Sequence, residues 1–347
     1  LGSAQMTALK TDTESFMDNA GTVKTRLGGS ALGSGASFQV RPAVEVRSSG
    51  DLTFSVDYDL GTITAVSGDQ PGTLTLRAAE NLRINGSLSD GFNSATGSTL
   101  DSGDSWSYRL VAGADLSAAD PMAVQRTLDA GVGDFILKGG ELIRTGTGSI
   151  QIAAGGDVSI GLDSDDSYNR ASVIYTAGRA DSNPAAYKPA SDTHFKKVAY
   201  GVDGGALSIS ADGSIRAPEF GQLTNNWLQR RGTIDSTGAV ALSPAWGVAY
   251  EYFNQGVGAL GGGNVRIEAG RNIENLSVSL PTTGRDYAAQ DVGSKLFETG
   301  GGSAEVHADG DIRGSFLYVQ KGQGRVTSGG DIGAMPESDL DPDASDN

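Results

Sequence analysis

The chain has 347 residues, including 51 glycines, 10 prolines and no cysteine, and its formal net charge is −16. The acidity opposes nucleic-acid binding, the lack of thiols excludes disulfides and cysteine-held iron–sulfur clusters, and no run of eighteen apolar residues offers a helical membrane span. The length suits two ordinary domains or one elongated repeat domain.

The N-terminal residues, Leu1-Gly2-Ser3, lack the basic and apolar stretches of a secretory signal peptide. Because the sequence begins within a pattern, we expect it to be a fragment of a longer protein.

A nine-residue pattern recurs along the chain: apolar, any, apolar, any, small, any, any, then Asp, Asn or Ser, then Leu, Ile or Val. The clearest copies end at Asn81-Leu82, Asp157-Val158, Ser214-Ile215 and Asn272-Ile273. Alternation gives a short strand with one buried face, and glycine with Asp or Asn supplies a corner. Each copy therefore predicts a strand, a corner and the start of another strand.

The polar corner residues recur over most of the chain, at Asp51, Asn81, Asp115, Asp157, Ser214, Asn272, Asp311 and Asp331. A corner placed identically after each strand favours superposed coils, so we predict an all-β, right-handed parallel β-helix over residues 1–335. Spacings longer than one coil indicate insertions, at residues 163–202 and 217–262. The corner side chains are expected to stack and to satisfy one another's amides. An antiparallel sandwich is the alternative, because Asn85-Gly86 is a hairpin signal.

Two further segments have their own signatures. Asp120-Pro121 followed by an apolar stretch and Gly131 predicts a helix, with an N-cap, a first-turn proline and a C-terminal glycine. Residues 336–347 are acidic and nearly free of apolar side chains, which predicts a disordered tail or linker.

The sequence resembles the filamentous haemagglutinin-like exoproteins of bacterial two-partner secretion. The stretches that carry the likeness are SWSYRLVAGADLSAADP (105–121), IRTGTGSIQIAAGGD (143–157) and GGNVRIEAGRNI (262–273). The resemblance covers most of residues 40–335. It implies a right-handed parallel β-helix, export through the inner membrane and through an outer-membrane barrel transporter, and secretion or display on the bacterial cell surface. It also implies roles in adhesion, aggregation, biofilm formation or contact-dependent competition. Neither the family's N-terminal secretion domain nor a C-terminal toxin domain is recognisable, so the resemblance implies a shaft segment.

Three acidic residues, Asp163, Asp165 and Asp166, form the first candidate site. Alternating carboxylates can bind Ca²⁺, but the glycine and terminal glutamate of an EF-hand are missing, which favours a solvated loop. The same carboxylates could serve a polysaccharide-cleaving β-helix enzyme, although no second carboxylate is identifiable elsewhere as a partner. The two histidines, His194 and His307, are too few for a multi-imidazole zinc site and are expected at the surface. We therefore predict no catalytic, cofactor-binding or metal-binding residues.

Aromatic residues concentrate in the two predicted insertions. The first insertion holds Tyr168, Tyr175, Tyr187, Phe195 and Tyr200, and the second holds Trp227, Trp246, Tyr250, Tyr252 and Phe253. The five in the second insertion are the candidate partner-binding residues, because aromatic side chains on a rigid shaft can stack on sugars or anchor a protein. The alternative, which we favour, is that the aromatics pack the insertions onto the coils. If residues 248–253 form a strand, Tyr250 and Tyr252 share one face.

Three functions follow. The first is a structural shaft of a secreted adhesin without catalytic residues. The second is a module that binds a host or bacterial glycan or protein through its insertions. The third, which the sequence favours least, is a polysaccharide-active enzyme.

Overall fold

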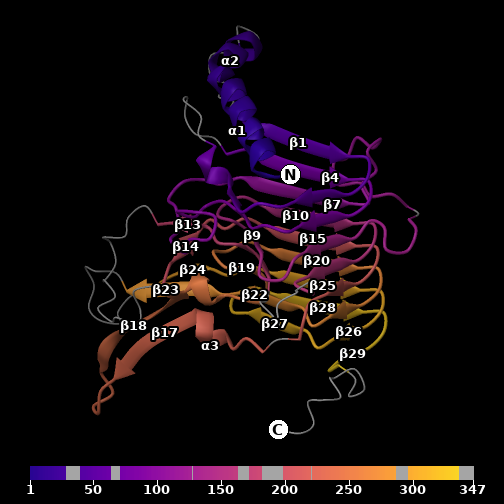
Figure 1. Ribbon diagram of the computed structural model, residues 1–347. Helices are drawn as coiled ribbons and strands as arrows, with labels where there is room; N and C mark the ends of the chain where they lie inside the picture. Colours follow the sequence, from indigo (N-terminus) through magenta and orange to yellow (C-terminus); the bar gives the residue numbers. More distant parts are fainter. Residues whose placement is uncertain are drawn as a thin grey trace.

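The computed structural model describes residues 1–28, 40–63, 71–126, 128–162, 172–181, 198–219, 221–286 and 296–335. Three long sheets, here called A, B and C, run side by side as the chain winds through successive coils (Figure 1). Every neighbouring pair of strands in these sheets is parallel, in contrast to a sandwich of hairpins. The fold is the predicted right-handed parallel β-helix.

Each coil contributes one strand to each sheet, except that the last coil contributes none to sheet C. Sheet A contains, in order, β1 (Ala43–Ser48), β4 (Thr73–Ala78), β7 (Ser107–Ala112), β10 (Ile150–Ala154), β15 (Leu207–Ala211), β20 (Val265–Ala269), β25 (Ala304–Ala308) and β28 (Gly324–Ser328). Sheet B contains β2 (Leu52–Phe54), β5 (Leu82–Ile84), β8 (Phe135–Leu137), β11 (Val158–Ile160), β16 (Ile215–Arg216), β21 (Ile273–Glu274), β26 (Ile312–Arg313) and β29 (Ile332–Gly333). Sheet C contains β3 (Tyr58–Asp59), β6 (Leu88–Ser89), β9 (Leu142–Thr145), β12 (Val173–Thr176), β19 (Gly256–Ala259), β22 (Ser277–Leu280) and β27 (Phe316–Val319).

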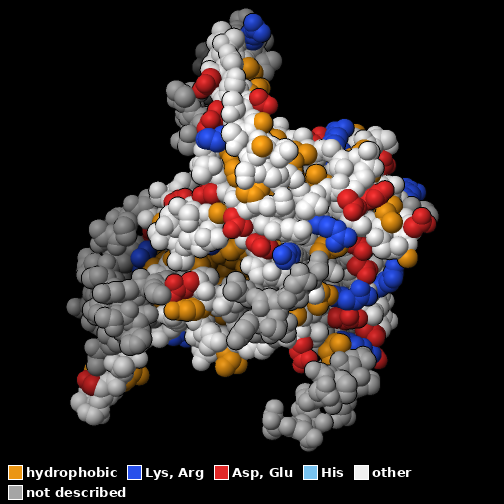
Figure 2. Space-filling model, in the orientation of Figure 1, with side chains coloured by type: hydrophobic (Ala, Val, Ile, Leu, Met, Phe, Trp, Pro, Cys, Tyr) orange, Lys and Arg blue, Asp and Glu red, His pale blue; other side chains and the backbone are white. Residues whose placement is uncertain are grey.

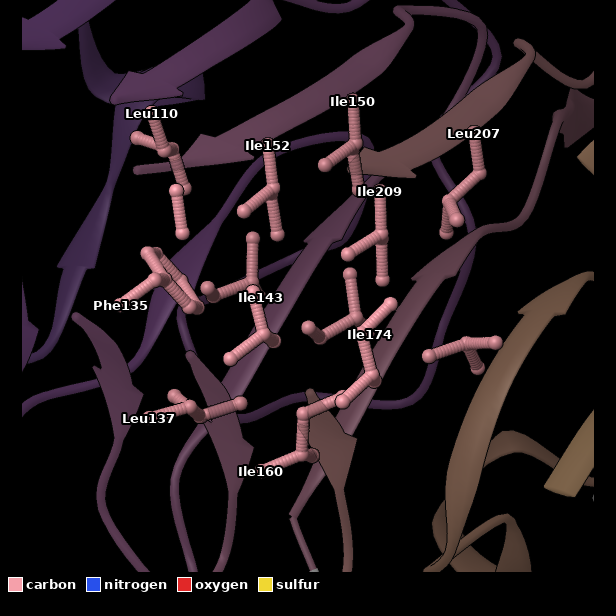
Figure 3. Close-up of a cluster of buried hydrophobic side chains, with 14 of the residues drawn as sticks. Leu110, Phe135, Leu137, Ile143, Ile150, Ile152, Ile160, Ile174, Leu207 and Ile209 are labelled. Carbon is pink, nitrogen blue, oxygen red and sulfur yellow. The ribbon is translucent and has the colours of Figure 1, made fainter. Parts of the chain in front are cut away.

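The register aligns the inward aliphatic side chains into columns. One column of sheet A runs through Val46, Leu76, Leu110, Ile152, Ile209, Ile267, Val306 and Val326. Figure 3 shows Ile152 and Ile209 pointing toward Ile143 and Ile174 of sheet C. These four side chains are at most 1% exposed, so the interior between the sheets is a continuous apolar core.

A ladder of side-chain hydrogen bonds runs along the corner between sheets A and B. Each corner residue except the last, Asp331, accepts a hydrogen bond from the backbone N–H of the corner residue in the next coil, at 2.7 to 3.3 Å. The members are Asp51, Asn81, Asp134, Asp157, Ser214, Asn272, Asp311 and Asp331. The ladder confirms that corner side chains satisfy the amides of their neighbours, which would otherwise be left unpaired.

The prediction of Asp115 as a corner was wrong, because Asp134 takes that place. The chain leaves the coil at Gly113 and returns at Gly133, both with positive φ (63° and 85°). A Cβ on Gly113 would lie 3.1 Å from the Cα of Gly133, so the exit and the return of the loop touch. Asp115 instead begins the loop and accepts hydrogen bonds from the backbone and hydroxyl of Ser117.

The helix predicted from Asp120 to Gly131 is also absent from the described residues there, which form turns. The Asp120 carboxylate accepts a hydrogen bond from the N–H of Met122, two residues on, which closes a turn rather than capping a helix. The loop then makes an antiparallel bridge between Ala114 and Val124 and packs on the outer face of sheet A. Met122 and Val124 are partly buried there.

Two helices that the analysis of the sequence did not predict precede the coils. Helix α1 (Ser3–Asp18) covers part of the N-terminal end of the stack and buries Met6 and Met17, and α2 (Ala20–Gly28) continues away from it (Figure 1). Residues 1–28 are therefore a helical cap rather than part of the β-helix. No helix in the described ranges is long and apolar enough to span a membrane.

The insertions build a small antiparallel sheet on one flank. The strands are β17 (Leu228–Ile234), β18 (Val240–Val248), β23 (Thr282–Asp286) and β24 (Leu296–Gly300), beside a two-stranded pair, β13 (Arg179–Ala180) and β14 (Gly201–Val202) (Figure 1). Each predicted insertion also contains one coil strand, β12 in 163–202 and β19 in 217–262. The strands β23 and β24 follow β22, outside both predicted ranges. Residues 336–347 lie outside the described residues.

Acidic and basic side chains intermix along the flank formed by sheets A and B (Figure 2). Arg216 pairs with Asp157 of the preceding coil (2.6 Å) and with Glu274 of the following coil (3.2 Å). Because these pairs are partly exposed, each contributes little to the stability.

Candidate functional site

Aromatic side chains of the predicted insertions, together with Phe92 of the loop after β6, form a second core against the outer face of sheet C, which we call the lateral cluster. Its aromatic members are Phe92, Tyr175, Trp227, Tyr250 and Phe253. The rings of Tyr175 and Tyr250 stack at 5.8 Å, and Phe253 meets both Tyr175 and Trp227 edge-on. Since the five rings are at most 3% exposed, the cluster fastens the flanking sheet to the coils.

The five candidate partner-binding residues differ in their exposure. Trp227, Tyr250 and Phe253 are buried, and the Tyr250 hydroxyl donates to the carbonyl of Ala177. Trp246 is half-buried, and Tyr252 is 39% exposed. Of the five, Tyr252 is the most exposed.

The segment that carries Tyr250 and Tyr252 is not the strand that the sequence predicted. Residues Tyr250–Tyr252 form a 3₁₀ turn, η4, so Tyr250 and Tyr252 do not share the face of a strand. The indole N–H of Trp246 donates to Thr282 Oγ1 of β23, and the ring lies over Gly284, where any Cβ would overlap it. The hydrogen bond to Thr282 and the contact with Gly284 make Trp246 part of the packing of the flanking sheet.

A buried arginine ties the loop after β6 to the lateral cluster. Arg144 is 3% exposed, donates to Ser89, to Tyr175 and to the carbonyls of Ser94 and Ala95, and lies 3.8 Å from the centre of the Phe92 ring. These contacts satisfy a cation that would be costly to bury alone. Arg144 therefore has a structural role.

Beside the lateral cluster lies a cavity of about 430 Å³, which we call the lateral cavity. It is lined by Leu100, Asp181, Tyr200, Glu251 and Arg285, among others. The Arg285 guanidinium lies 4.2 Å from the centre of the Tyr200 ring and 3.4 Å from an Asp181 carboxylate oxygen. An aromatic face with charged hydrogen-bonding groups around it is suited to a polar ligand such as a sugar.

A second cavity, which the analysis of the sequence missed, lies between α1 and the first coils, and we call it the acidic pocket. It measures about 270 Å³ and is lined by Glu14, Asp90, Asp101, Asp104 and Trp106, among others. An ideal Cβ on Gly61 would lie 2.9 Å from Asp90 Oδ1 and 3.1 Å from Asp59 Oδ1. These two oxygens are thus at most about 6 Å apart, so the two carboxyl groups lie close together.

The buried carboxyl group of this pocket is Asp90, which is 4% exposed. Its oxygens accept hydrogen bonds from the N–H groups of Gly91 (2.6 Å) and Trp106 (2.5 Å). Burial raises the pKa of Asp90 to about 7, although these hydrogen bonds act against the shift. Burial also raises the pKa of Asp59 and of Asp101. At neutral pH the pocket therefore holds a carboxyl group near half-protonation.

The parallel register brings Asp59 and Asp90 together. Asp59 pairs with Ser89, so Asp90 follows one position later on the neighbouring coil. The corners Asp51 and Asn81 are 30 positions apart. Adding the same interval to Asp59 gives Ser89, and this signal in the sequence would have found the pair.

The remaining candidate residues lie either outside the described residues or on the surface of the stack. Asp163, Asp165, Asp166 and His194 lie outside the described residues, as do Tyr168, Tyr187 and Phe195. His307 lies on the outer face of β25, where its ring nitrogens contact Thr327 Oγ1 (2.8 Å) and Asp309 Oδ1 (3.0 Å). No group of three or more His, Asp or Glu side chains in the described ranges is arranged to hold a metal ion.

Comparison of the chain with protein-family models, curated proteins and solved structures finds no match.

Proposed function

We propose that the chain is a shaft segment of a secreted, surface-displayed bacterial adhesin of the filamentous haemagglutinin-like type. The observation that carries the proposal is that sheets A, B and C continue through successive coils while the larger insertions pack outside them. A stack of this kind keeps a constant cross-section and adds about 4.8 Å of length per coil, which suits a spacer that holds a binding surface away from a membrane. In the full-length protein, the partner in export would be the outer-membrane barrel transporter of two-partner secretion.

The adhesive part of the proposal places a glycan or protein ligand at the lateral cavity. Support comes from the Tyr200 ring, the Arg285–Asp181 ion pair and the carboxylate of Glu251 around one opening.

The test uses beads coated with the purified chain, which are presented to bacterial and epithelial cells and, in parallel, to a glycan array. Tyr200→Ala is expected to reduce attachment, and Arg266→Ala, on the exposed outer face of β20, serves as the matched control. Silence of the chain in both assays would leave the shaft without an adhesive role.

The acidic pocket favours one alternative, a polysaccharide-cleaving enzyme with Asp90 as the general acid. Incubation of the chain with a panel of bacterial and host polysaccharides tests it directly. New reducing or unsaturated ends that appear with the native chain and disappear with Asp90→Asn would overturn the shaft proposal. No product with either protein is the expected result.

A further inference from the structure

A further cavity, which we call the amide pocket, lies on the flank of the stack where the short helix α3 (Thr224–Trp227) meets β17 (Figure 1). It measures about 430 Å³, within the range of about 300–1,000 Å³ that is typical of small-molecule sites. The residues that line it are Gly221, Gln222, Asn226, Gln229, Tyr252 and Asn254. Among these described residues none is charged, and four have a carboxamide side chain.

The two walls of the amide pocket are fixed to each other. Oε1 of Gln222 accepts a hydrogen bond from the N–H of Asn254 (3.3 Å), and the Gln222 N–H donates to Oε1 of Gln255 (3.0 Å). The rings of Trp227 and Phe253 are 2% exposed and meet edge-on at 5.1 Å. Residues next to both rings line the pocket, so the lateral cluster holds its shape without a ligand and little ordering is needed on binding.

The carboxamides of the pocket have unused hydrogen-bonding capacity. The side chains of Asn226, Gln229 and Asn254 make no hydrogen bond within the part of the chain that the structure describes. Gln222 donates to the carbonyl of Tyr252 and accepts one hydrogen bond. Because a carboxamide has two N–H donors and an oxygen that accepts twice, the pocket offers donors and acceptors side by side without charge.

This lining matches the chemistry of an uncharged sugar. A sugar hydroxyl group donates and accepts at once, as a carboxamide does. A charged ligand would leave water for a lining with no opposite charge among its described residues, which is costly. Tyr252 is 39% exposed and adds an aromatic side chain, which can pack on the apolar face of a sugar ring. The lateral cavity differs, because charged side chains such as Asp181 and Arg285 line it.

We propose that the amide pocket binds an uncharged hexose unit of a glycan. The carboxamides of Asn226, Gln229 and Asn254 bind its hydroxyl groups, and the side chain of Tyr252 packs against its ring. The proposal is separate from the ligand proposed for the lateral cavity, because the two cavities have no described lining residue in common.

The test titrates the full chain, isotope-labelled for NMR, with lactose, maltose, mannobiose and diacetylchitobiose. Their non-reducing units are galactose, glucose, mannose and N-acetylglucosamine. At least one of them is expected to bind saturably at millimolar concentration and to shift the side-chain amide signals of Asn226, Gln229 and Asn254. The signal of Asn225, which is exposed in α3 and does not line the pocket, is expected to stay in place. Failure of all these sugars to bind would overturn the proposal.

The pattern of shifts also separates the two cavities. Shifts at Tyr200 and Arg285 without shifts at the amide pocket would place the sugar in the lateral cavity, which would overturn this proposal and support the adhesive one. Oxidation of the primary alcohol of the bound sugar to a carboxylate tests the requirement for an uncharged ligand. The oxidised sugar is expected to bind about tenfold more weakly, and equal affinity would contradict the choice of ligand.

Variants of the chain give an independent check. Asn226→Ala and Gln229→Ala each remove one carboxamide and are expected to weaken binding by about three- to tenfold, the range of a hydrogen bond between uncharged groups. Asn225→Ala, the matched control at the adjacent residue, is expected to bind like the native chain. Because none of these three side chains makes a hydrogen bond within the described residues, all three variants are expected to unfold at the native urea concentration. Equal affinity of the three variants would show that the carboxamides take no part.

Discussion

Replacement of Asp134 by alanine tests the corner ladder, on which the account of the stack depends. Asp134 Oδ1 accepts a hydrogen bond from the N–H of Asp157 at 2.7 Å, and Asp134 is itself held by Asn81 at 2.8 Å. The variant keeps the second bond and loses the first. An unpaired N–H at a half-buried corner costs about 1–3 kcal/mol, and bonds to charged acceptors lie in the upper half of that range.

We therefore expect Asp134→Ala to lower the free energy of unfolding by about 2 kcal/mol, and Asp134→Asn, which keeps an acceptor oxygen, by about 1 kcal/mol or less. Equilibrium unfolding in urea measures both values, and amide exchange at Asp157 reports the local effect. The matched control is Asp129→Ala, which removes an exposed carboxylate from the loop between Gly113 and Gly133. The ladder reasoning is refuted if both alanine variants unfold at the same urea concentration and exchange at Asp157 is unchanged.

Three further predictions concern the core, the acidic pocket and the lateral cluster. Ile152→Asp places a carboxylate in a column position that is 1% exposed and should lower the free energy of unfolding by more than about 4 kcal/mol. Gln151→Ala, on the outer face, should lower it by less than about 0.5 kcal/mol. Urea unfolding of the two variants checks which residues face the core. The folded chain holds the Asp90 proton more tightly than the unfolded chain does, because the pKa of Asp90 is raised from 3.8 to about 7. The free energy of unfolding should thus fall as pH rises from about 4 to about 7, by up to about 1.4 kcal/mol per pH unit, and Asp90→Asn should flatten this dependence in urea titrations at pH 5, 6, 7 and 8. Tyr250→Phe removes the 2.9 Å hydrogen bond to the Ala177 carbonyl and should lower the thermal stability by about 1 kcal/mol without changing the far-ultraviolet spectrum; an unchanged melting temperature would contradict the buried position.

The nine-residue pattern predicted the fold because its physical basis is local and repeated. An apolar alternation and a polar corner are visible within one copy, and stacking only multiplies them. Seven of the eight predicted corners, all except Asp115, belong to the ladder. Asp115 was predicted as a corner because Ala112-Gly113-Ala114-Asp115 has the spacing of one, whereas the positive φ of Gly113 turns the chain out into a loop.

The helical cap and the acidic pocket depend on contacts that one copy of the pattern does not contain. Met6, Leu9, Thr13 and Met17 recur at helical spacing, which was a usable signal, but their burial depends on the exposed end of the first coil. The pKa of Asp90 is raised by burial and by the charge of Asp59 on the preceding coil, and Trp106 lines the same pocket. Neither neighbour is close to Asp90 in the sequence, so only the register reveals the pocket.

The meeting of Gly113 and Gly133 has a practical consequence for engineering. Because the two ends of that loop touch, its length can change without moving the strands on either side, and the entropic cost of closure grows only slowly with added residues. A foreign epitope or a small folded domain whose termini lie close together could be grafted there. It would project from the outer face of sheet A, so the coil stack would serve as a carrier with a defined site for the inserted segment.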